Sequence, residues 1–83
     1  MREVVNGKFY NTETAQEIAR NGSETLYRTR KSNWFIVHTR KSGPMPFDQW
    51  VHPRSERDAL RWLESHSDFD IIMQHFADQV EEA

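Results

Sequence analysis

Short apolar runs separated by polar turn residues open the chain. Val4-Val5 and residues 8–10 flank Asn6-Gly7. An Asn-Gly pair between two short apolar runs is the strongest local signal for a tight hairpin turn. The pattern therefore predicts a short β-ribbon at the start of the chain.

The spacing of apolar residues changes after this ribbon. Ala15, Ile18 and Ala19 would share one face of a helix, and Asn11 or Thr12 could cap its start. The Asn-Gly pair at positions 21–22 is typical of a helix end. We therefore expect a short helix of about two turns, which is too short to be stable without docking on the sheet.

Two segments rich in β-branched and aromatic residues follow, at 25–30 and 34–39, with polar residues between them. This arrangement predicts a β-hairpin. Residues 40–46 contain Lys-Ser-Gly-Pro and a second proline, which cannot continue a strand ladder and indicate an exposed loop. Residues 47–52 favour a further strand that ends at Pro53.

The second strand of the predicted hairpin carries apolar side chains on both of its faces. Phe35 and Val37 would point to one face, because side chains alternate along a strand. Trp34, Ile36 and His38 would point to the other. A strand that is apolar on both faces is expected in the middle of a sheet.

Two helices are predicted in the C-terminal third. Ser55, with Asp58 three residues later, resembles a capping box, and the helix that follows would run to about His66. Ser67 or Asp68 would open the last helix. Five residues at helical spacing form the expected core stripe of that helix: Phe69, Ile72, Met73, Phe76 and Val80.

These elements together predict one α+β domain over residues 1–83. We expect a small antiparallel sheet of three to five strands, one short helix after the first strand or strands, and two C-terminal helices packed on the sheet. A chain of 83 residues closes around a single core. The absence of cysteine and of any long apolar run indicates a soluble, cytoplasmic protein without membrane contact.

Charge is divided unevenly along the chain. Residues 1–54 hold nine Lys and Arg against five Asp and Glu, a net charge of +4. Residues 55–83 hold two against eight, a net charge of −6. Such asymmetry suggests a nucleic-acid or charged protein partner, although strands and helices with differently solvated faces would also produce it.

The chain offers few groups for catalysis or metal binding. No two of its four histidines lie three or four residues apart, as two ligands on one helical turn would. It has no Gly-x-Ser-x-Gly motif and no phosphate-binding glycine array. We therefore expect no metal, no cofactor and no enzymatic activity.

Two surfaces remain as candidate binding sites. The first combines cations for phosphates with an aromatic ring for stacking, which suits single-stranded nucleic acid; its residues are Arg28, Arg30, Lys31, Trp34, Arg40 and Lys41. The second is the acidic side of the last helix, represented by Asp70 and Asp78. These carboxylates would suit a basic groove on another protein. Exposed hairpins and helices carry such charges without any partner as well.

Three segments carry a resemblance to a known family. They are Lys-Phe-Tyr-Asn-Thr-Glu-Thr-Ala at 8–15, Leu-Tyr-Arg-Thr-Arg-Lys-Ser-Asn-Trp-Phe at 26–35, and Ala-Leu-Arg-Trp-Leu-Glu at 59–64. Together they resemble a family of small proteins from bacteriophages and other bacterial mobile elements. Ser32-Asn33 stands where the family has Lys-Gly. The resemblance implies a phage-type setting, in which small proteins often inhibit host machinery.

The leading hypothesis is therefore a non-enzymatic, anti-CRISPR-like inhibitor that binds a host protein or ribonucleoprotein defence complex through exposed charged residues. An alternative is a nucleic-acid-binding regulator that uses the basic aromatic hairpin. A third is a structural or homodimerising module. The sequence does not decide which surface works, or whether Trp34 and Trp50 are buried.

Overall fold

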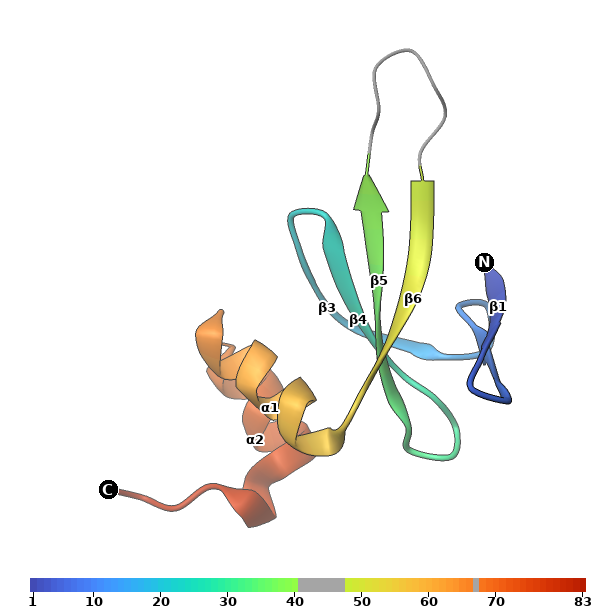
Figure 1. The fold of residues 1–83 in the computed structure, drawn as a ribbon. Helices are drawn as coiled ribbons and strands as arrows, with labels where there is room; N and C mark the ends of the chain where they lie inside the picture. The colour runs from blue at the N-terminus through green and yellow to red at the C-terminus, as the bar shows by residue number, and fades with distance from the viewer. Residues whose placement is uncertain (41–47, 67) are drawn as a thin grey trace.

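The computed structural model describes residues 1–40, 48–66 and 68–83. The predicted α+β class is confirmed, with antiparallel strands followed by two helices (Figure 1). The strands are β1 (Arg2–Val5), β2 (Lys8–Asn11), β3 (Gln16–Asn21), β4 (Glu24–Arg28), β5 (Trp34–Arg40) and β6 (Asp48–Arg54). The helices are α1 (Glu56–Ser65) and α2 (Phe69–Phe76), and a 3-10 turn over Ala77–Gln79 follows α2.

The strands form two sheets. β1 and β2 make a two-stranded ribbon, and β3-β4-β5-β6 make a four-stranded sheet in that order. In the ribbon, Asn6 and Gly7 have φ values of 50° and 76°, as a tight hairpin turn with two left-handed residues requires. The predicted Asn-Gly hairpin is therefore confirmed.

The short helix expected after the ribbon is wrong, because this segment forms strand β3. The Asn11 side chain does accept the N–H of Glu13 at 3.0 Å, but only a turn follows. The register of β3 against β4 shifts between Glu17 and Ala19. Ile18 and Ala19 consequently both pack on the same core cluster, although they are neighbours in a strand. This bulge imitates the one-sided apolar spacing of a helix.

The second of two Asn-Gly pairs also has a different role from the expected one. Gly22 has φ 59° and lies in the turn that joins β3 to β4, rather than after a helix. Asn21 pairs with Glu24 across this turn. Gly22 thus supplies the left-handed conformation that a hairpin turn shares with a helix C-terminus.

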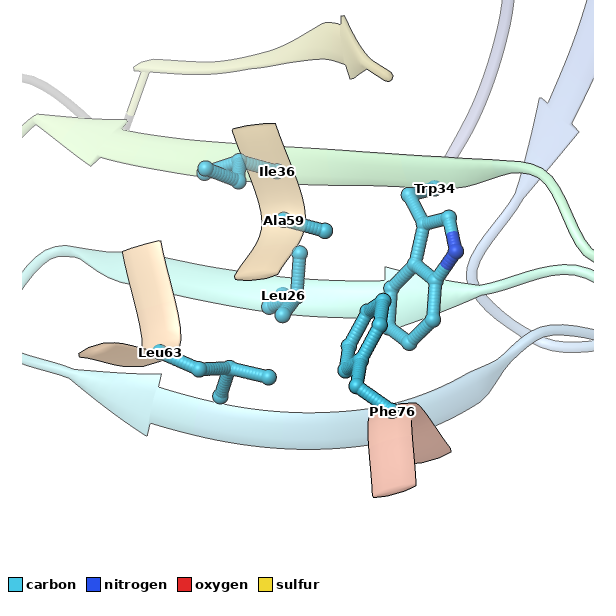
Figure 2. Close-up of a cluster of buried hydrophobic side chains, with 6 residues drawn as sticks. All are labelled: Leu26, Trp34, Ile36, Ala59, Leu63 and Phe76. Atoms are coloured by element: carbon cyan, nitrogen blue, oxygen red, sulfur yellow. The ribbon is translucent and has the colours of Figure 1, made fainter. Parts of the chain in front are cut away.

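β5 is an inner strand, as the sequence predicts, and both of its faces are buried. Trp34 and Ile36 lie on the face that the helices cover. Six buried residues form the cluster on this side: Leu26, Trp34, Ile36, Ala59, Leu63 and Phe76 (Figure 2). Phe35 and Val37 face the opposite side, where Tyr10 of the ribbon and Val51 of β6 complete a second cluster.

β6 lies at the edge of the sheet and is followed directly by α1. Pro53 pairs with Phe35, and its missing N–H is tolerated because the outer side of an edge strand has no ladder partner. The N–H of Val51, on that same outer side, donates to the Glu3 carboxylate at 2.9 Å. The ribbon therefore closes part of the open sheet edge. The loop predicted at 40–46 lies almost wholly outside the described residues.

The predicted cap of α1 is confirmed, whereas the predicted core stripe of the last helix is partly wrong. Ser55 caps α1, since its hydroxyl accepts the N–H of Asp58 at 3.1 Å. In α2, Phe76 is fully buried and stacks on Trp34 with ring centroids 5.1 Å apart. Phe69 and Met73 are exposed, as is Val80, which lies beyond the helix.

The buried side of α2 is rotated about the helix axis relative to the apolar stripe that the sequence predicts. Ile71 and Ile72 pack against the core and His75 contacts Trp34, so the buried side is centred away from Phe69 and Met73. Asp68 occupies the N-cap position, and Ser67, the other predicted start, lies outside the described residues. Among the residues described, neither helix combines the length and apolar character needed to cross a bilayer.

Truncation of Phe76 tests the core. Phe76→Ala should lower the free energy of unfolding by about 3–5 kcal/mol, because it removes a fully buried ring between Trp34 and the helices. Phe69→Ala is the matched control, and should change it by less than about 0.5 kcal/mol. Urea denaturation of both variants measures the difference. Equal losses would contradict the described packing of α2.

His75 should make stability depend on pH. Burial, and secondarily the Arg28 guanidinium, lower the pKa of His75 from its ordinary value. The folded state therefore disfavours the protonated ring. The contribution of the neutral His75 ring to the free energy of unfolding is complete above about pH 6.5 and is lost as the pH falls below that value, because the unfolded chain then binds the proton more readily. The melting temperature should fall between about pH 7 and pH 5, and should fall less in His75→Gln. The same fall in both proteins would contradict this origin.

Candidate functional site

The structure separates the predicted basic surface into two places. Arg30 and Lys31 lie in the turn between β4 and β5, whereas Arg40 ends β5. The seven residues of β5 span about 20 Å at the usual rise of a strand. Lys41 lies outside the described residues. The fold therefore does not bring Arg30 and Lys31 together with Arg40 in a single patch.

Trp34 is buried, and Arg28 lies half-buried beside it. Trp34 is 4% exposed, which answers a question that the sequence left open. Its ring stacks on Phe76, and the Arg28 guanidinium lies 5.7 Å from the ring centroid. Arg28 also donates to the Ser32 hydroxyl at 2.8 Å. Trp34 has no open face on which a base could stack, so we leave it out of the candidate site.

A groove of about 500 Å³ lies between β2 and the β4–β5 turn. Its cationic side chains are Lys8, Arg30 and Lys31, and its exposed aromatic ring is Phe9. The rest of the lining comes from Gly7, Tyr10, Asn11, Thr14, Thr29 and Asn33. We call this feature the basic groove.

Both walls of the basic groove are fixed by local structure. On one side, Tyr10 packs edge-on against Phe35 at 5.1 Å and anchors β2 to the sheet. On the other, the Thr29 N–H donates to the Asn33 carbonyl at 2.8 Å, and the Asn33 N–H donates to the Thr29 hydroxyl at 3.0 Å. These two hydrogen bonds close the turn that carries Arg30 and Lys31.

The electrostatics of the basic groove favour anions. No Asp or Glu is among the described residues that line it, and within the described ranges no salt bridge neutralises Lys8, Arg30 or Lys31. Phe9 is 61% exposed and lies opposite the exposed Val4 in the ribbon. Three cationic residues and the exposed aromatic residue Phe9 therefore contribute to the lining of this concave surface.

Sequence reasoning found Arg30 and Lys31 but missed Lys8 and Phe9. These two residues follow the Asn-Gly turn of the ribbon, some twenty residues earlier in the chain. Tertiary contacts bring the ribbon beside the β4–β5 turn, through the packing of Tyr10 on Phe35 and the hydrogen bond from Val51 to Glu3. The local signal that could have indicated Lys8 and Phe9 is the exposure pattern of β2, in which both residues are exposed and the next residue, Tyr10, is buried.

A second surface lies where β5 and β6 extend beyond the helices. Trp50 is 41% exposed and stacks on His38, with ring centroids 5.2 Å apart and an interplanar angle of 10°. The Arg40 guanidinium lies 5.9 Å from the Trp50 ring and forms an ion pair with Asp48 at 3.2 Å. Arg40 is therefore exposed but already has a carboxylate partner.

Beside Trp50, His38 and His52 form an imidazole pair with charged neighbours. His38 Nδ1 lies 3.3 Å from a Glu24 carboxylate oxygen, and Arg54 lies 3.1 Å from His52 Nδ1. Burial, followed by the positive charge of Arg54, lowers the pKa of His52. Across the described part of the chain, no cluster of three or more His, Asp or Glu side chains is arranged to hold a metal ion.

The predicted acidic surface is exposed but divided. Asp70 lies in the first turn of α2, beside the exposed Phe69, and Asp78 lies in the 3-10 turn that follows the helix. An eight-residue helix is about 12 Å long, so the two carboxylates stand near opposite ends of it. Asp70, Phe69 and Met73 together form what we call the α2 outer face.

Comparison of the chain with models of protein families, with curated proteins and with solved structures gave no match.

Proposed function

We propose that this protein is a non-enzymatic nucleic-acid-binding protein that holds a single strand in the basic groove. One observation carries the proposal: Lys8, Arg30 and Lys31 converge on a concave surface that has no described carboxylate in its lining and includes the exposed ring of Phe9. The groove volume lies within the range of sites that take ligands of nucleotide size.

Each part of the groove has a role in this proposal. Lysine and arginine side chains bind backbone phosphates and release the counterions that surround them, which supplies most of the affinity. Phe9 offers a ring on which an unpaired base stacks, and stacking requires that the base is not already in a duplex. Asn11, Asn33 and Thr29 add neutral hydrogen-bonding groups to the same lining. The combination favours a single strand over a duplex.

Salt and substitution test this binding. Affinity for a fluorescent single-stranded oligonucleotide, measured by anisotropy, should fall steeply with added salt. Arg30→Ala should reduce the salt slope by about 0.7, since one phosphate contact to a single strand is lost. Phe9→Ala should cost about 1–3 kcal/mol of binding free energy through lost stacking.

Arg57→Ala is the matched control, because it removes one exposed cation from α1, outside the groove lining. It should leave both the affinity and the salt slope close to those of the unmodified protein. No complex at low salt, or equal losses in Arg30→Ala and Arg57→Ala, would refute the proposal.

A second candidate function is inhibition of a host nucleic-acid-guided defence complex, as an anti-CRISPR protein does. The α2 outer face favours it, because Phe69 is 69% exposed next to the carboxylate of Asp70. An aromatic anchor flanked by negative charge suits a basic channel that otherwise holds nucleic acid. In this role the protein would bind the complex itself and would not need the basic groove.

The two candidates respond oppositely to the same substitutions. If the protein inhibits a guided nuclease, the double variant Phe69→Ala, Asp70→Asn should lose inhibition of target cleavage in an assay with purified effector complexes, whereas Arg30→Ala should retain it. Loss in Arg30→Ala alone would assign the effect to nucleic-acid binding. No inhibition of any tested complex by the unmodified protein would count against this second candidate.

A further inference from the structure

Strand β3 forms one edge of the four-stranded sheet, so its outer side has no ladder partner. The other edge of the sheet is partly closed, because the Glu3 carboxylate accepts the Val51 N–H and Pro53 has no N–H to donate. Within the described residues, no hydrogen bond from any element other than β4 reaches the main chain of Glu17 or Arg20 in β3. β3 is therefore the edge on which a further strand has room to pair.

The hydrogen bonds of β4 show which of its main-chain groups point toward β3. Residues along an antiparallel strand turn their N–H and C=O groups alternately to one neighbouring strand and to the other. The carbonyl of Ser23 accepts the N–H of Thr39 at 2.8 Å, so Ser23 faces β5. By this alternation Thr25 and Tyr27 face β5 as well, and their main-chain groups make no hydrogen bond to β3.

Glu17 and Arg20 are the residues of β3 that stand opposite Tyr27 and Thr25. Their main-chain N–H and C=O groups therefore point outward. Residues three apart on a regular strand lie on opposite faces, but the register shift between Glu17 and Ala19 brings both charged side chains to one face. The Arg20 guanidinium and the Glu17 carboxylate accordingly form an exposed ion pair at 3.1 Å. The bulge thus gives the open edge a cation and an anion on the same face.

The opposite face of this edge is apolar. Ile18 and Ala19 are half-buried, and both pack on the cluster beneath the helices that contains Phe76. On its inner side, the bulge is spanned by a single residue of β4, Leu26, which stands opposite Ala19. A strand on the outer side would likewise place one side chain beside Ile18 and Ala19.

We propose that the β3 edge binds an extended peptide segment of another protein as an added antiparallel strand. In antiparallel pairing, each outward residue exchanges both of its hydrogen bonds with one partner residue, and opposite charges on directly opposed residues stabilise the pair. The segment therefore carries an acidic residue opposite Arg20, then an apolar residue beside Ile18, then a basic residue opposite Glu17. Main-chain hydrogen bonds supply the affinity, and this charge order supplies the specificity.

A single strand fits this edge better than a second copy of the chain. Two copies paired through β3 around a two-fold axis would set their helix layers side by side on the same face of the sheet. Ile71, Ile72 and Phe76 of α2 pack in the same cluster as Ile18, so the helix layer already reaches the edge strand. An extended segment adds no helix there. Its site is also separate from the basic groove, because neither charged residue of β3 lines that groove.

Fluorescence anisotropy of the full-length protein with short labelled peptides tests the proposal. Thr-Val-Glu-Val-Lys-Val-Thr has the expected charge order. It should bind about 10-fold more tightly than Thr-Val-Lys-Val-Glu-Val-Thr, in which both opposed pairs become like charges. The double variant Glu17→Arg, Arg20→Glu should reverse this preference. Exchange of the other exposed ion pair of the sheet, by Arg40→Asp with Asp48→Arg, is the matched control and should leave the preference unchanged.

Methylation of peptide nitrogens tests the pairing on the unmodified protein. N-methyl groups on the Glu and Lys of the first peptide should abolish binding, because these two residues donate to the carbonyls of Arg20 and Glu17. An N-methyl group on the central Val should leave the affinity close to that of the parent peptide, since its N–H points away from β3.

The proposal is overturned by any of these results: no saturable binding below about 1 mM peptide, equal binding of the two charge orders, or equal loss from both kinds of methylation. A dimer that light scattering detects in the unmodified protein and not in the double variant, without peptide binding, would assign the edge to a second copy instead. Thermal melts establish that each protein variant is folded, and the methylated peptides give a result that does not depend on any variant.

Discussion

The fold depends on the burial of β5 on both of its faces. Trp34 and Ile36 pack beneath the helices, and Phe35 and Val37 pack beneath the N-terminal ribbon. Neither the ribbon nor the two short helices would be stable alone, because each buries its apolar side only against this sheet. The chain thus folds as three layers around one strand. A small domain is only marginally stable, so substitution of the buried residues of β5 should lower the free energy of unfolding more than substitution elsewhere.

Two of the surfaces described above, the basic groove and the surface around Trp50, lie at the ends of β5. At its start, the β4–β5 turn carries Arg30 and Lys31 against the ribbon, and the basic groove forms between them. At its end, the sheet extends past the helices, and Trp50, His38 and His52 remain open to solvent or half covered. The middle of the strand is fully used for packing. These two surfaces therefore lie where the core ends, whereas the α2 outer face lies on the exposed side of a helix.

The charge division of the sequence has a structural meaning different from its first interpretation. The positive half contains internal compensation, since Arg40 pairs with Asp48, and Arg20 pairs with Glu17. Arg28 is engaged with Trp34 and Ser32. Among the described residues, Lys8, Arg30 and Lys31 of the basic groove are in none of these ion pairs, while the acidic helices present separate carboxylates to solvent. Local ion pairs, rather than net charge, determine which cations are left to attract an anion.

The sequence by itself determined the α+β class, the Asn-Gly hairpin, the two-sided burial of β5 and the Ser55 cap, because each depends on residues close together in the chain. Tertiary structure alone decided the rest. The bulge at Ile18 turned an apparent helix into β3, and the contacts of Ile71 and Ile72 rotated the buried side of α2 away from Phe69. Lys8 and Phe9 joined Arg30 and Lys31, and His38 met His52, only because distant segments pack on one sheet. Periodicity reports which side of an element is apolar, but not which other element will cover it or what that contact leaves exposed.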